Sequence, residues 1–295
     1  MIKIRIPAST ANLGSGFDSL GIALDLYNYV EIDFSDRCEI SSKDGSEIPT
    51  GENNLIYVSA KKVFEKAGKN FTGLKIIEEN NVPFARGLGS SSACIIGGVF
   101  GANELIGKPF SKDRLLDIAA EIEGHPDNVS PALLGGLTVN VMEGNRVHYV
   151  KSEIPEELVF AAFVPPFELK TEDARKVMPK EVSMKDAVYN LSRSSLAAAS
   201  FLSGKYENLK IAFEDKLHQP YRLPLIPGGF EIIEKSYEKG ALAAYISGAG
   251  STMMGIFDCG KQKANEIAKE ILSSGNFEGW KYYILNADNS GAAAL

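Results

Sequence analysis

At 295 residues the chain is long enough for about two ordinary domains, and 44% hydrophobic and 23% charged residues are typical of a globular protein. The formal net charge of −7 and the scattered Lys and Arg residues argue against a polynucleotide partner. No apolar run is long enough to span a membrane, and Met1–Ile6 alternates apolar and charged residues, unlike a signal peptide. Cys38, Cys94 and Cys259 show no disulfide or zinc spacing, so a reducing cytoplasm fits best.

In the first half of the chain the pattern predicts a β-rich opening. The first strand is expected to end at Pro7, and Ala8–Asp18 is then a polar, glycine-containing loop. The elements expected after it are an apolar stretch, three strands and three helices: Leu20–Leu26; strands Tyr29–Phe34, Leu74–Glu78 and Leu137–Met142; helices Asn53–Lys66, Ala93–Ile106 and Lys112–Glu123.

The pattern of apolar and polar residues that predicts helices and strands is interrupted around Lys151–Pro155. We place a domain boundary there, between an N-terminal domain, residues 1–155, and a C-terminal domain, residues 156–295. The second domain is expected to be α/β in pattern. Its predicted elements are strands Leu158–Val164, Ala243–Ile246, Met253–Phe257 and, as the last strand, Tyr282–Leu285, with helices Met184–Leu202, Tyr206–Phe213, Phe230–Lys239 and Lys261–Leu272.

The most informative stretch is a loop that leads directly into a helix: Pro83, Phe84, Ala85, Arg86, Gly87, Leu88, Gly89, Ser90, Ser91, Ser92 and Ala93. Its glycines allow the backbone to approach a ligand closely, and its serines are expected to cap the first helical turn. Free N–H groups and the helix dipole favour phosphate, so a nucleotide triphosphate with magnesium is the natural ligand. The alternative is an ordinary capped turn. Walker A and dinucleotide-binding patterns fit poorly.

This loop resembles, nearly letter for letter, the Pro-x-x-x-Gly-Leu-Gly-Ser-Ser-x-Ala loop of the GHMP small-molecule kinases. Within that superfamily, Pro7–Asp18 and Ile246–Ser251 are similar to the first and third motifs of the homoserine kinase family, in the same order and at similar spacing. The Gly-His-Pro-Asp-Asn run at residues 124–128 and Thr171–Arg175 also look like this family. We do not expect the Gly-Phe-Asp of motif one or the Gly-His-Pro-Asp-Asn run in mevalonate and galactose kinases.

The resemblance implies the α+β two-domain GHMP kinase fold, with an N-terminal domain like ribosomal protein S5 domain 2 and a ferredoxin-like C-terminal domain. It also implies a homodimer and magnesium-dependent phosphoryl transfer from ATP to the hydroxyl of L-homoserine, in threonine biosynthesis. A GHMP kinase for another small alcohol and a non-catalytic nucleotide-binding paralogue are the alternatives. Ser15 and Ser251 stand where the family commonly carries Pro, which affects loop stiffness more than chemistry.

Homoserine is a zwitterion with a terminal hydroxyl, so its site needs an anion, a cation and polar groups. Asp18 is the expected ammonium partner, although it could merely cap the next helix. Arg175 and Arg222 are the expected carboxylate partners, because a guanidinium fork matches two carboxylate oxygens. The assignment of Arg222 rests only on the run Gln219–Arg222. His125 is expected to orient the substrate, and His218 is interpreted as an ordinary polar residue near a helix end.

Magnesium takes a few hard oxygen ligands beside phosphate and water, and we expect Glu123 and Ser91 to supply them. Glu121 is the alternative ligand. The polar residues Asn12, Asn128 and Thr171 are assigned to the substrate hydroxyl and the γ-phosphate.

Asp127 is the sequence counterpart of the base in mevalonate kinases. The homoserine kinase resemblance suggests instead that Asn128 faces the hydroxyl, that no strong base is present and that deprotonation occurs late, with the phosphate itself a conceivable acceptor.

Overall fold

Seven strands form the larger of two β-sheets in the computed structural model, which describes residues 1–295. They are β1 (Ile2–Ala11), β2 (Leu20–Ser35), β3 (Glu39–Ser42), β4 (Gly73–Glu79), β5 (Leu137–Glu143), β6 (Arg146–Ser152) and β11 (Ala293–Ala294). The main path runs β11-β1-β2-β4-β3, and β5 pairs with β2 and carries β6. Apart from the parallel β3–β4 pair, neighbouring strands are antiparallel.

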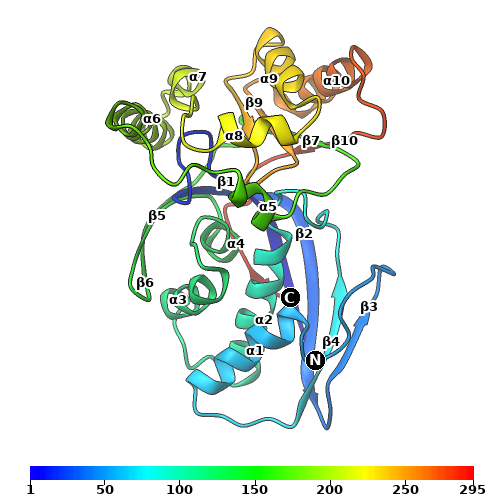
Figure 1. Cartoon of the computed structure of the whole chain (residues 1–295). Coiled ribbons are helices and arrows are strands. Elements are labelled where there is room, and N and C mark those ends of the chain that lie inside the picture. The colour runs from blue at the N-terminus through cyan, green and yellow to red at the C-terminus, as the bar shows by residue number, and fades with distance from the viewer.

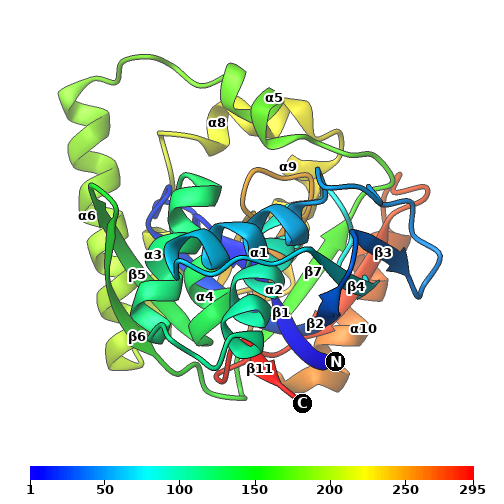
Figure 2. The same cartoon turned by 90° about the horizontal axis from the view of Figure 1, so that it is seen from below.

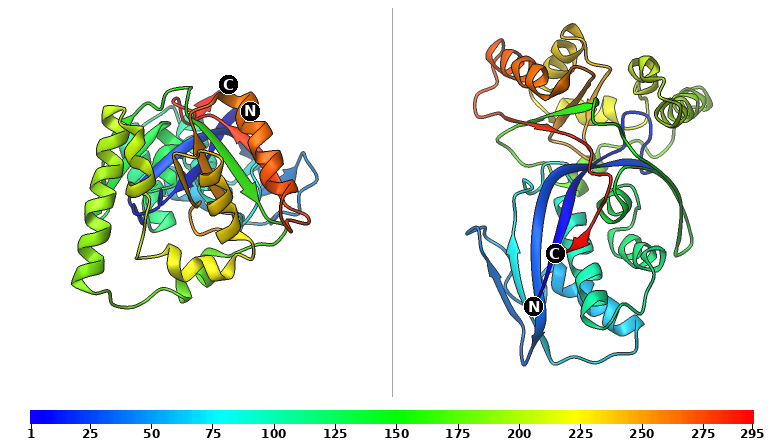
Figure 3. Two further views of the ribbon diagram at one scale, coloured as in Figure 1. Left: turned by 90° about the horizontal axis from the view of Figure 1, so that it is seen from above. Right: turned by 180° about the vertical axis from the view of Figure 1, so that it is seen from behind.

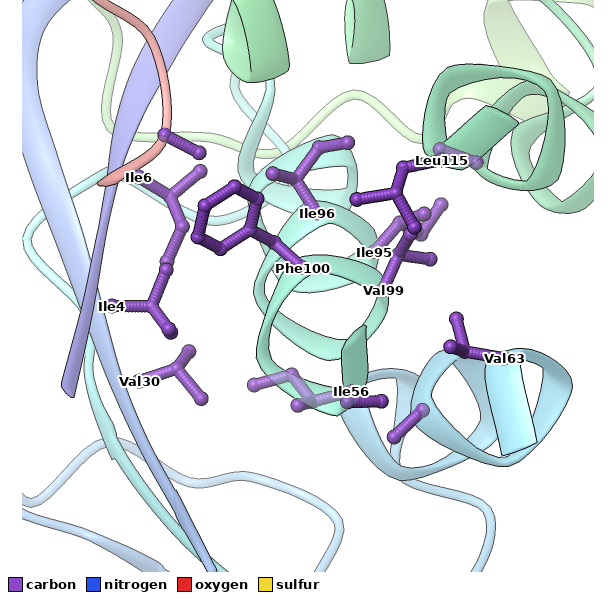
Figure 4. Packing of buried hydrophobic residues seen from close by; sticks show 14 of the residues in the cluster. Ile4, Ile6, Val30, Ile56, Val63, Ile95, Ile96, Val99, Phe100 and Leu115 are labelled. Atoms are coloured by element: carbon purple, nitrogen blue, oxygen red, sulfur yellow. The ribbon is translucent and has the colours of Figure 1, made fainter. Parts of the chain in front are cut away.

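Four helices lie along one face of this sheet (Figures 1 and 3). They are α1 (Leu55–Lys66), α2 (Ser90–Leu105), α3 (Lys112–Glu123) and α4 (Val129–Leu134). The central helix α2 is buried on nearly every side. Figure 4 shows Phe100 and Ile96 of α2 facing Ile4 and Ile6 of the sheet, with Val63 of α1 and Leu115 of α3 on the side of α2 away from the sheet. A Cβ atom on Gly98 would lie 2.3 Å from the Ile56 carbonyl oxygen, so α1 packs directly on the α2 backbone, as the glycines of this helix predict.

The second sheet has four antiparallel strands in the order β10-β7-β9-β8. These are β7 (Val159–Val164), β8 (Ala243–Ile246), β9 (Met253–Phe257) and β10 (Lys281–Leu285). Helices α9 (Gly229–Glu238) and α10 (Gly260–Ser273) pack on one face, against Ala161 and Phe163. The next side chains along β7, Phe160 and Ala162, point to the other face. This strand order is that of a ferredoxin-like unit, so the expected two-domain α+β fold is confirmed.

Short helices and α6 complete the second half, and α6 lies at the outer edge of the molecule (Figure 2). The elements are α5 (Thr171–Lys176), α6 (Met184–Ser203), α7 (Leu209–Ala212) and α8 (Gln219–Arg222), with 3-10 turns at Tyr206–Asn208 and Leu223–Leu225. Side chains of α6 and α7, among them Phe201 and Ala212, join the core on the Phe160 face of the second sheet. No helix of the chain combines the length and apolarity needed to cross a lipid bilayer.

Three expectations about the strands were wrong. The first strand does not end at Pro7: the pairing shifts register between Pro7 and Ala8 and then continues to Ala11, because a bulge accommodates a residue that lacks an N–H donor. Residues Leu20–Ser35 form one long strand instead of two separate segments. The strand ending at Leu285 is not the last one, since β11 returns to pair with β1.

The chain end links the two halves of the molecule. After β10, Asp288 donates its backbone N–H to the carbonyl of Ala23, and Leu295 donates to the carbonyl of Lys3. The last residues therefore lie against the first sheet, although the sequence boundary assigns them to the C-terminal domain. The division at residues 155 and 156 stays a prediction.

Candidate active site

A cleft of about 570 Å³ lies where the two halves of the chain meet. Segments of the first half contribute Asn12, Asp18, most of the loop before α2 and the turn after α3; the second half contributes α5, Arg222 and the loop between β8 and β9. The site residues that the family resemblance predicted come from these same segments, which are far apart in the sequence. Of those residues, only Pro83, Leu88 and Ala93 do not line the cleft. Leu88 and Ala93 are buried in the two cores and support the loop from behind.

The loop before α2 has the backbone of a phosphate-binding loop. Gly87 and Gly89 have φ of +76° and +72°, and Gly89 is the N-cap of α2. No side chain caps the helix, so the expectation that the serines do so was wrong: Ser90, Ser91 and Ser92 already belong to the first turn. The first N–H groups of a helix have no carbonyl partner within it. At α2 these donors and the positive end of a 16-residue helix face the cleft.

Contacts from the second half hold this loop in place. Arg86 donates to the carbonyl oxygens of Pro165 and Pro166, at 3.2 and 3.1 Å, and pairs with Glu168. Ser247 donates its hydroxyl to the Gly87 carbonyl at 2.6 Å. The Arg86 guanidinium is therefore used to fix the loop to the second half of the chain.

Asn12 connects the first and third motifs. Its amide nitrogen donates to the Gly248 carbonyl at 2.7 Å, and its side-chain oxygen accepts from the Asp18 backbone N–H at 2.9 Å. The residue is buried and has a φ of +70°, a conformation that Asn tolerates better than most residues. Since both ends of the amide are engaged, Asn12 positions the loop that carries Asp18.

Glu123 and two serines form a cluster of oxygen atoms at the start of α2. Ser92 donates to one Glu123 carboxylate oxygen at 2.8 Å, and the exposed Ser91 lies 3.4 Å from the other. Burial raises the pKa of Glu123, and the Ser92 hydrogen bond and the charge of His125 offset this only in part. Glu121, the alternative ligand, pairs instead with Lys62 and Lys66 and does not line the cleft.

A second polar cluster follows α3. His125 Nδ1 lies 2.5 Å from Asp127 Oδ1, and Ser9 donates its hydroxyl to Asn128 Oδ1 at 2.8 Å. Burial lowers the pKa of His125, but the Asp127 hydrogen bond and the neighbouring carboxylate charges outweigh it, and the net pKa is raised. The Asp127 carboxylate is thereby engaged by His125, while the amide nitrogen of Asn128 has only a 3.5 Å contact with Asp127.

The charged residues expected to bind a zwitterion come together on one side of the cleft. Arg175 donates to both carboxylate oxygens of Asp18. Arg222 is 1% exposed and lies over the ring of Phe17, where burial and then the charge of Arg175 lower its pKa to about 10. Thr171, the first residue of α5, is exposed at the cleft wall. Arg222, whose assignment rested on the run Gln219–Arg222 alone, lies in the cleft with the others.

Several residues at the site were not singled out from the sequence. Ser9 was expected in a loop but lies in β1, where it contacts Asn128. Residues Gly248–Gly250 line the cleft; the sequence placed them in the glycine-rich third motif, Ile246–Ser251, but no role was assigned to them individually. His218 touches Arg222, and nothing about a single His in the sequence indicates such a contact.

Comparisons with known proteins agree with this architecture. Residues 54–136 match the family model of the GHMP kinases N terminal domain, and residues 195–276 match that of the GHMP kinases C terminal domain. The homoserine kinase of Clostridium beijerinckii is 49% identical over 100% of this chain and 99% of its own. That of Caldicellulosiruptor bescii is 44% identical over 100% and 97%.

Solved structures lead to the same family. The crystal structure of homoserine kinase from Cytophaga hutchinsonii superposes with a TM-score of 0.90 at 28% identity, covering 100% of this chain and 97% of that one. Methanococcus jannaschii mevalonate kinase, at 16% identity and a TM-score of 0.71 over 96% and 97%, shares the fold. The full-length likeness and the two matched domains establish that this chain belongs to the homoserine kinase family of the GHMP kinases.

Proposed function

We propose that this chain transfers the γ-phosphoryl group of ATP to the side-chain hydroxyl of L-homoserine, yielding O-phospho-L-homoserine for threonine biosynthesis. The observation that carries the proposal is the shared cleft: the free start of α2 faces the same space as Asp18, Arg175 and Arg222. One part suits a polyphosphate and the other a zwitterion. The full-length likeness to homoserine kinases favours this substrate over another small alcohol and favours an enzyme over a non-catalytic paralogue.

Residues of this chain would hold the nucleotide phosphates through the loop Pro83–Ala93 and its free N–H groups. Magnesium fits the oxygen atoms of Glu123, Ser91 and Ser92, since hydroxyl and carboxylate oxygens are the ligands it accepts beside phosphate. Of the two serines, Ser91 is exposed and keeps the longer contact with Glu123, so we retain it as the proposed ligand. Bound magnesium would neutralise phosphate charge as it develops during transfer.

A matched pair of variants tests the metal site. Even an outer-shell partner of a metal is typically worth about 10- to 100-fold in affinity, so Glu123→Gln is expected to raise the magnesium concentration for half-maximal rate at least tenfold. Glu121→Gln is the control, because Glu121 lies two residues away and pairs with lysines outside the cleft. Equal magnesium requirements in the two variants would remove Glu123 from the site.

The substrate's charges find partners in Asp18 for the ammonium and in Arg175 and Arg222 for the carboxylate. Asn128 and Thr171 would then lie near the hydroxyl and the γ-phosphate, with Asn12 and His125 positioning the surrounding loops. The hydroxyl oxygen bonds to the γ-phosphorus as the bond to ADP breaks, and the hydroxyl proton passes late to the transferred phosphate. This order fits the Asp127 carboxylate, which is already engaged by His125.

The deciding experiment is ADP release from ATP and magnesium with L-homoserine, run beside mevalonate, galactose and L-serine. Selectivity for homoserine that disappears in Arg175→Ala would support both the substrate and its carboxylate contact. Turnover of another alcohol would keep the kinase and overturn the substrate. Nucleotide binding without any turnover would instead favour a non-catalytic paralogue.

A homodimer is the remaining part of the proposal. The likeness to the family supports it, and α6 exposes Met184, Val188 and Leu191, spaced on one side of the helix, as apolar surface that a second copy would cover. Light scattering at several protein concentrations tests it, and Leu191→Glu should shift a dimer of this kind to the monomer. A cytoplasmic location likewise stays a prediction, which fractionation of cells checks.

A further inference from the structure

His218 is the most deeply buried histidine at the site and has no role in the proposed reaction as described so far. It is 0% exposed and lies at the start of α8, four residues before Arg222. Its Nε2 lies 2.7 Å from the carbonyl oxygen of Gly14, and its Nδ1 lies 3.4 Å from Nη1 of Arg222. One imidazole therefore contacts both the loop that carries Asp18 and the buried guanidinium.

These partners determine the protonation of the ring. A carbonyl oxygen only accepts hydrogen bonds, so Nε2 carries the proton that it donates to Gly14. A guanidinium only donates, so Nδ1 has its lone pair free to accept from Arg222. The ring is thus neutral, in agreement with burial, which lowers the pKa of His218 and outweighs the opposing charge of Asp215. Only this tautomer satisfies both neighbours at once.

The loop that contains Gly14 and Phe17 is held against His218 at both of these residues. Gly14 has a φ of +68°, and a Cβ atom there would lie 2.3 Å from the carbonyl oxygen of Phe213, so the loop backbone packs directly on the second half of the chain. The ring of Phe17 stacks on His218, with centroids 5.2 Å apart and planes inclined by 22°. The same Phe17 ring lies under the guanidinium groups of Arg222 and Arg175, at 5.1 and 5.6 Å.

We propose that His218 is a positioning residue that fixes the Arg222 guanidinium relative to the loop of Asp18, and so sets the recognition of the substrate's α-carboxylate. The inference rests on the proposed function, in which Arg222 binds that carboxylate. The other contacts of Arg222 go to backbone carbonyls: Nε lies 3.4 Å from that of Ala174, and Nη1, which has two N–H groups, donates one to that of Gly248 at 3.2 Å. The imidazole is the one side-chain acceptor among these three contacts, and Phe17 holds the ring that supplies it.

His218→Phe keeps an aromatic ring against Phe17 and removes both hydrogen bonds. Hydrogen bonds to charged groups are worth about a ten- to hundredfold change in a binding constant, so KM for L-homoserine is expected to rise by about that factor. KM for ATP and kcat at saturating homoserine should stay within about threefold, since neither depends on the carboxylate. His218→Asn restores an acceptor near the Nδ1 position and is expected to recover part of the loss.

A substrate without the carboxylate separates positioning from general damage. For 3-aminopropan-1-ol, which has the ammonium and hydroxyl of homoserine but no carboxylate, kcat/KM should be the same in wild type and His218→Phe. Tyr237→Phe is the matched control for stability, because Tyr237 lies on α9 and the change removes the hydrogen bond that its hydroxyl accepts from the Ala244 N–H of β8, away from the cleft. It should leave both substrates unaffected.

Equal losses for homoserine and 3-aminopropan-1-ol, or no loss in His218→Phe, would overturn the positioning role while leaving homoserine kinase activity standing. Wild-type protein that fails to phosphorylate homoserine would overturn the proposed function itself and this inference with it. If His218→Phe does not fold, His218→Asn carries the test: a smaller rise in KM for homoserine with 3-aminopropan-1-ol unaffected would support the proposal, and equal losses on both substrates, or none on either, would count against it.

Discussion

Arg175 donates two hydrogen bonds to Asp18, one to each carboxylate oxygen, at 2.8 and 3.1 Å. The two side chains, one from α5 and one from the loop after β1, are 40% and 35% exposed and both line the cleft. In the proposed complex Asp18 binds an ammonium and Arg175 a carboxylate. The ion pair of the free protein thus joins the two charges that the zwitterion would take up, and binding must loosen it.

Asp18→Asn separates the binding role of this pair from a structural one. An ion pair this exposed contributes only about 0–1 kcal/mol to stability, so the free energy of unfolding measured in urea should fall by no more than that. KM for homoserine should rise by about 10-fold or more, because a charged partner of the substrate is lost. Asp173→Asn, which breaks the exposed pair with Lys176 on the same short helix as Arg175, is the control. A large stability loss with an unchanged KM would show that the pair serves the fold.

Gly89 and Gly107 lie at opposite ends of α2 and give a matched test of the phosphate loop. Both have positive φ, +72° and +85°, so Ala at either position costs about 1–2 kcal/mol of backbone strain. At Gly107 a Cβ atom has nothing within 4 Å, whereas at Gly89 it would lie 2.0 Å from Ser9 Oγ. Gly89→Ala should therefore raise KM for ATP and cost more stability.

Ser9 in turn holds Asn128, so the Gly89 variant should also lower kcat. Gly107→Ala should show only the backbone strain. Its free energy of unfolding, measured in urea, should fall modestly, and KM for ATP and kcat should not change. If the two variants had the same KM for ATP, the loop would have no part in nucleotide binding.

The sequence predicted the start and end of α3 correctly, because Ser111 caps it and Gly124 ends it in the left-handed conformation. It also predicted β8 and β9 to the residue. It missed β3, β6 and β11. For β6 a local signal existed, because β6 forms a hairpin with β5 across the two-residue turn Gly144-Asn145. For β11 none did, because its partner β1 lies at the other end of the chain. The local residue pattern predicts an element that is defined by its own residues and their neighbours. It does not predict pairing between strands that are distant in the chain.

The same distinction applies to the site. Motif resemblance predicted which residues line the cleft, with few exceptions. It did not predict that Asp18 pairs with Arg175, or that both ends of Asn12 are used within the protein. Nor did it distinguish His218 from an ordinary polar residue. Such contacts form between side chains that are distant in the sequence and that only the fold brings together. Asp18 and Arg175, for example, are 157 residues apart.

The raised pKa of His125 predicts how its contribution to stability varies with pH. The charged form is favoured in the folded protein, so the contribution is fully present below the unfolded pKa of about 6.5 and is lost as pH rises through the higher folded pKa. The excess stability of wild type over His125→Gln should thus be larger at about pH 5.5 than at about pH 9. Urea unfolding measures it, with Glu143→Gln, which breaks an exposed contact to His148, as the control. An excess that grows with pH would contradict the raised pKa.

Asp127 and Asn128 are adjacent, and their variants decide whether the reaction uses a protein base. A general base is worth about 100- to 10,000-fold in rate, so Asp127→Asn should lower kcat by that much if Asp127 accepts the hydroxyl proton. We expect a loss below about tenfold, because Asp127 Oδ1 is held by His125 at 2.5 Å and the proton passes late to the phosphate.

Asn128→Ala should lower kcat further, by about 100-fold, since loss of one preorganised donor typically costs that much. His125→Gln controls for the indirect effect of Asp127 on its partner, and unfolding curves confirm that each variant is folded. A folded Asp127→Asn without turnover, beside an Asn128→Ala that scarcely changes it, would identify Asp127 as the base. The opposite ranking would exclude Asp127 as the base and would support late transfer of the proton to the phosphate, since the Ser9 hydroxyl, the other side chain bonded to Asn128, is not a base at neutral pH.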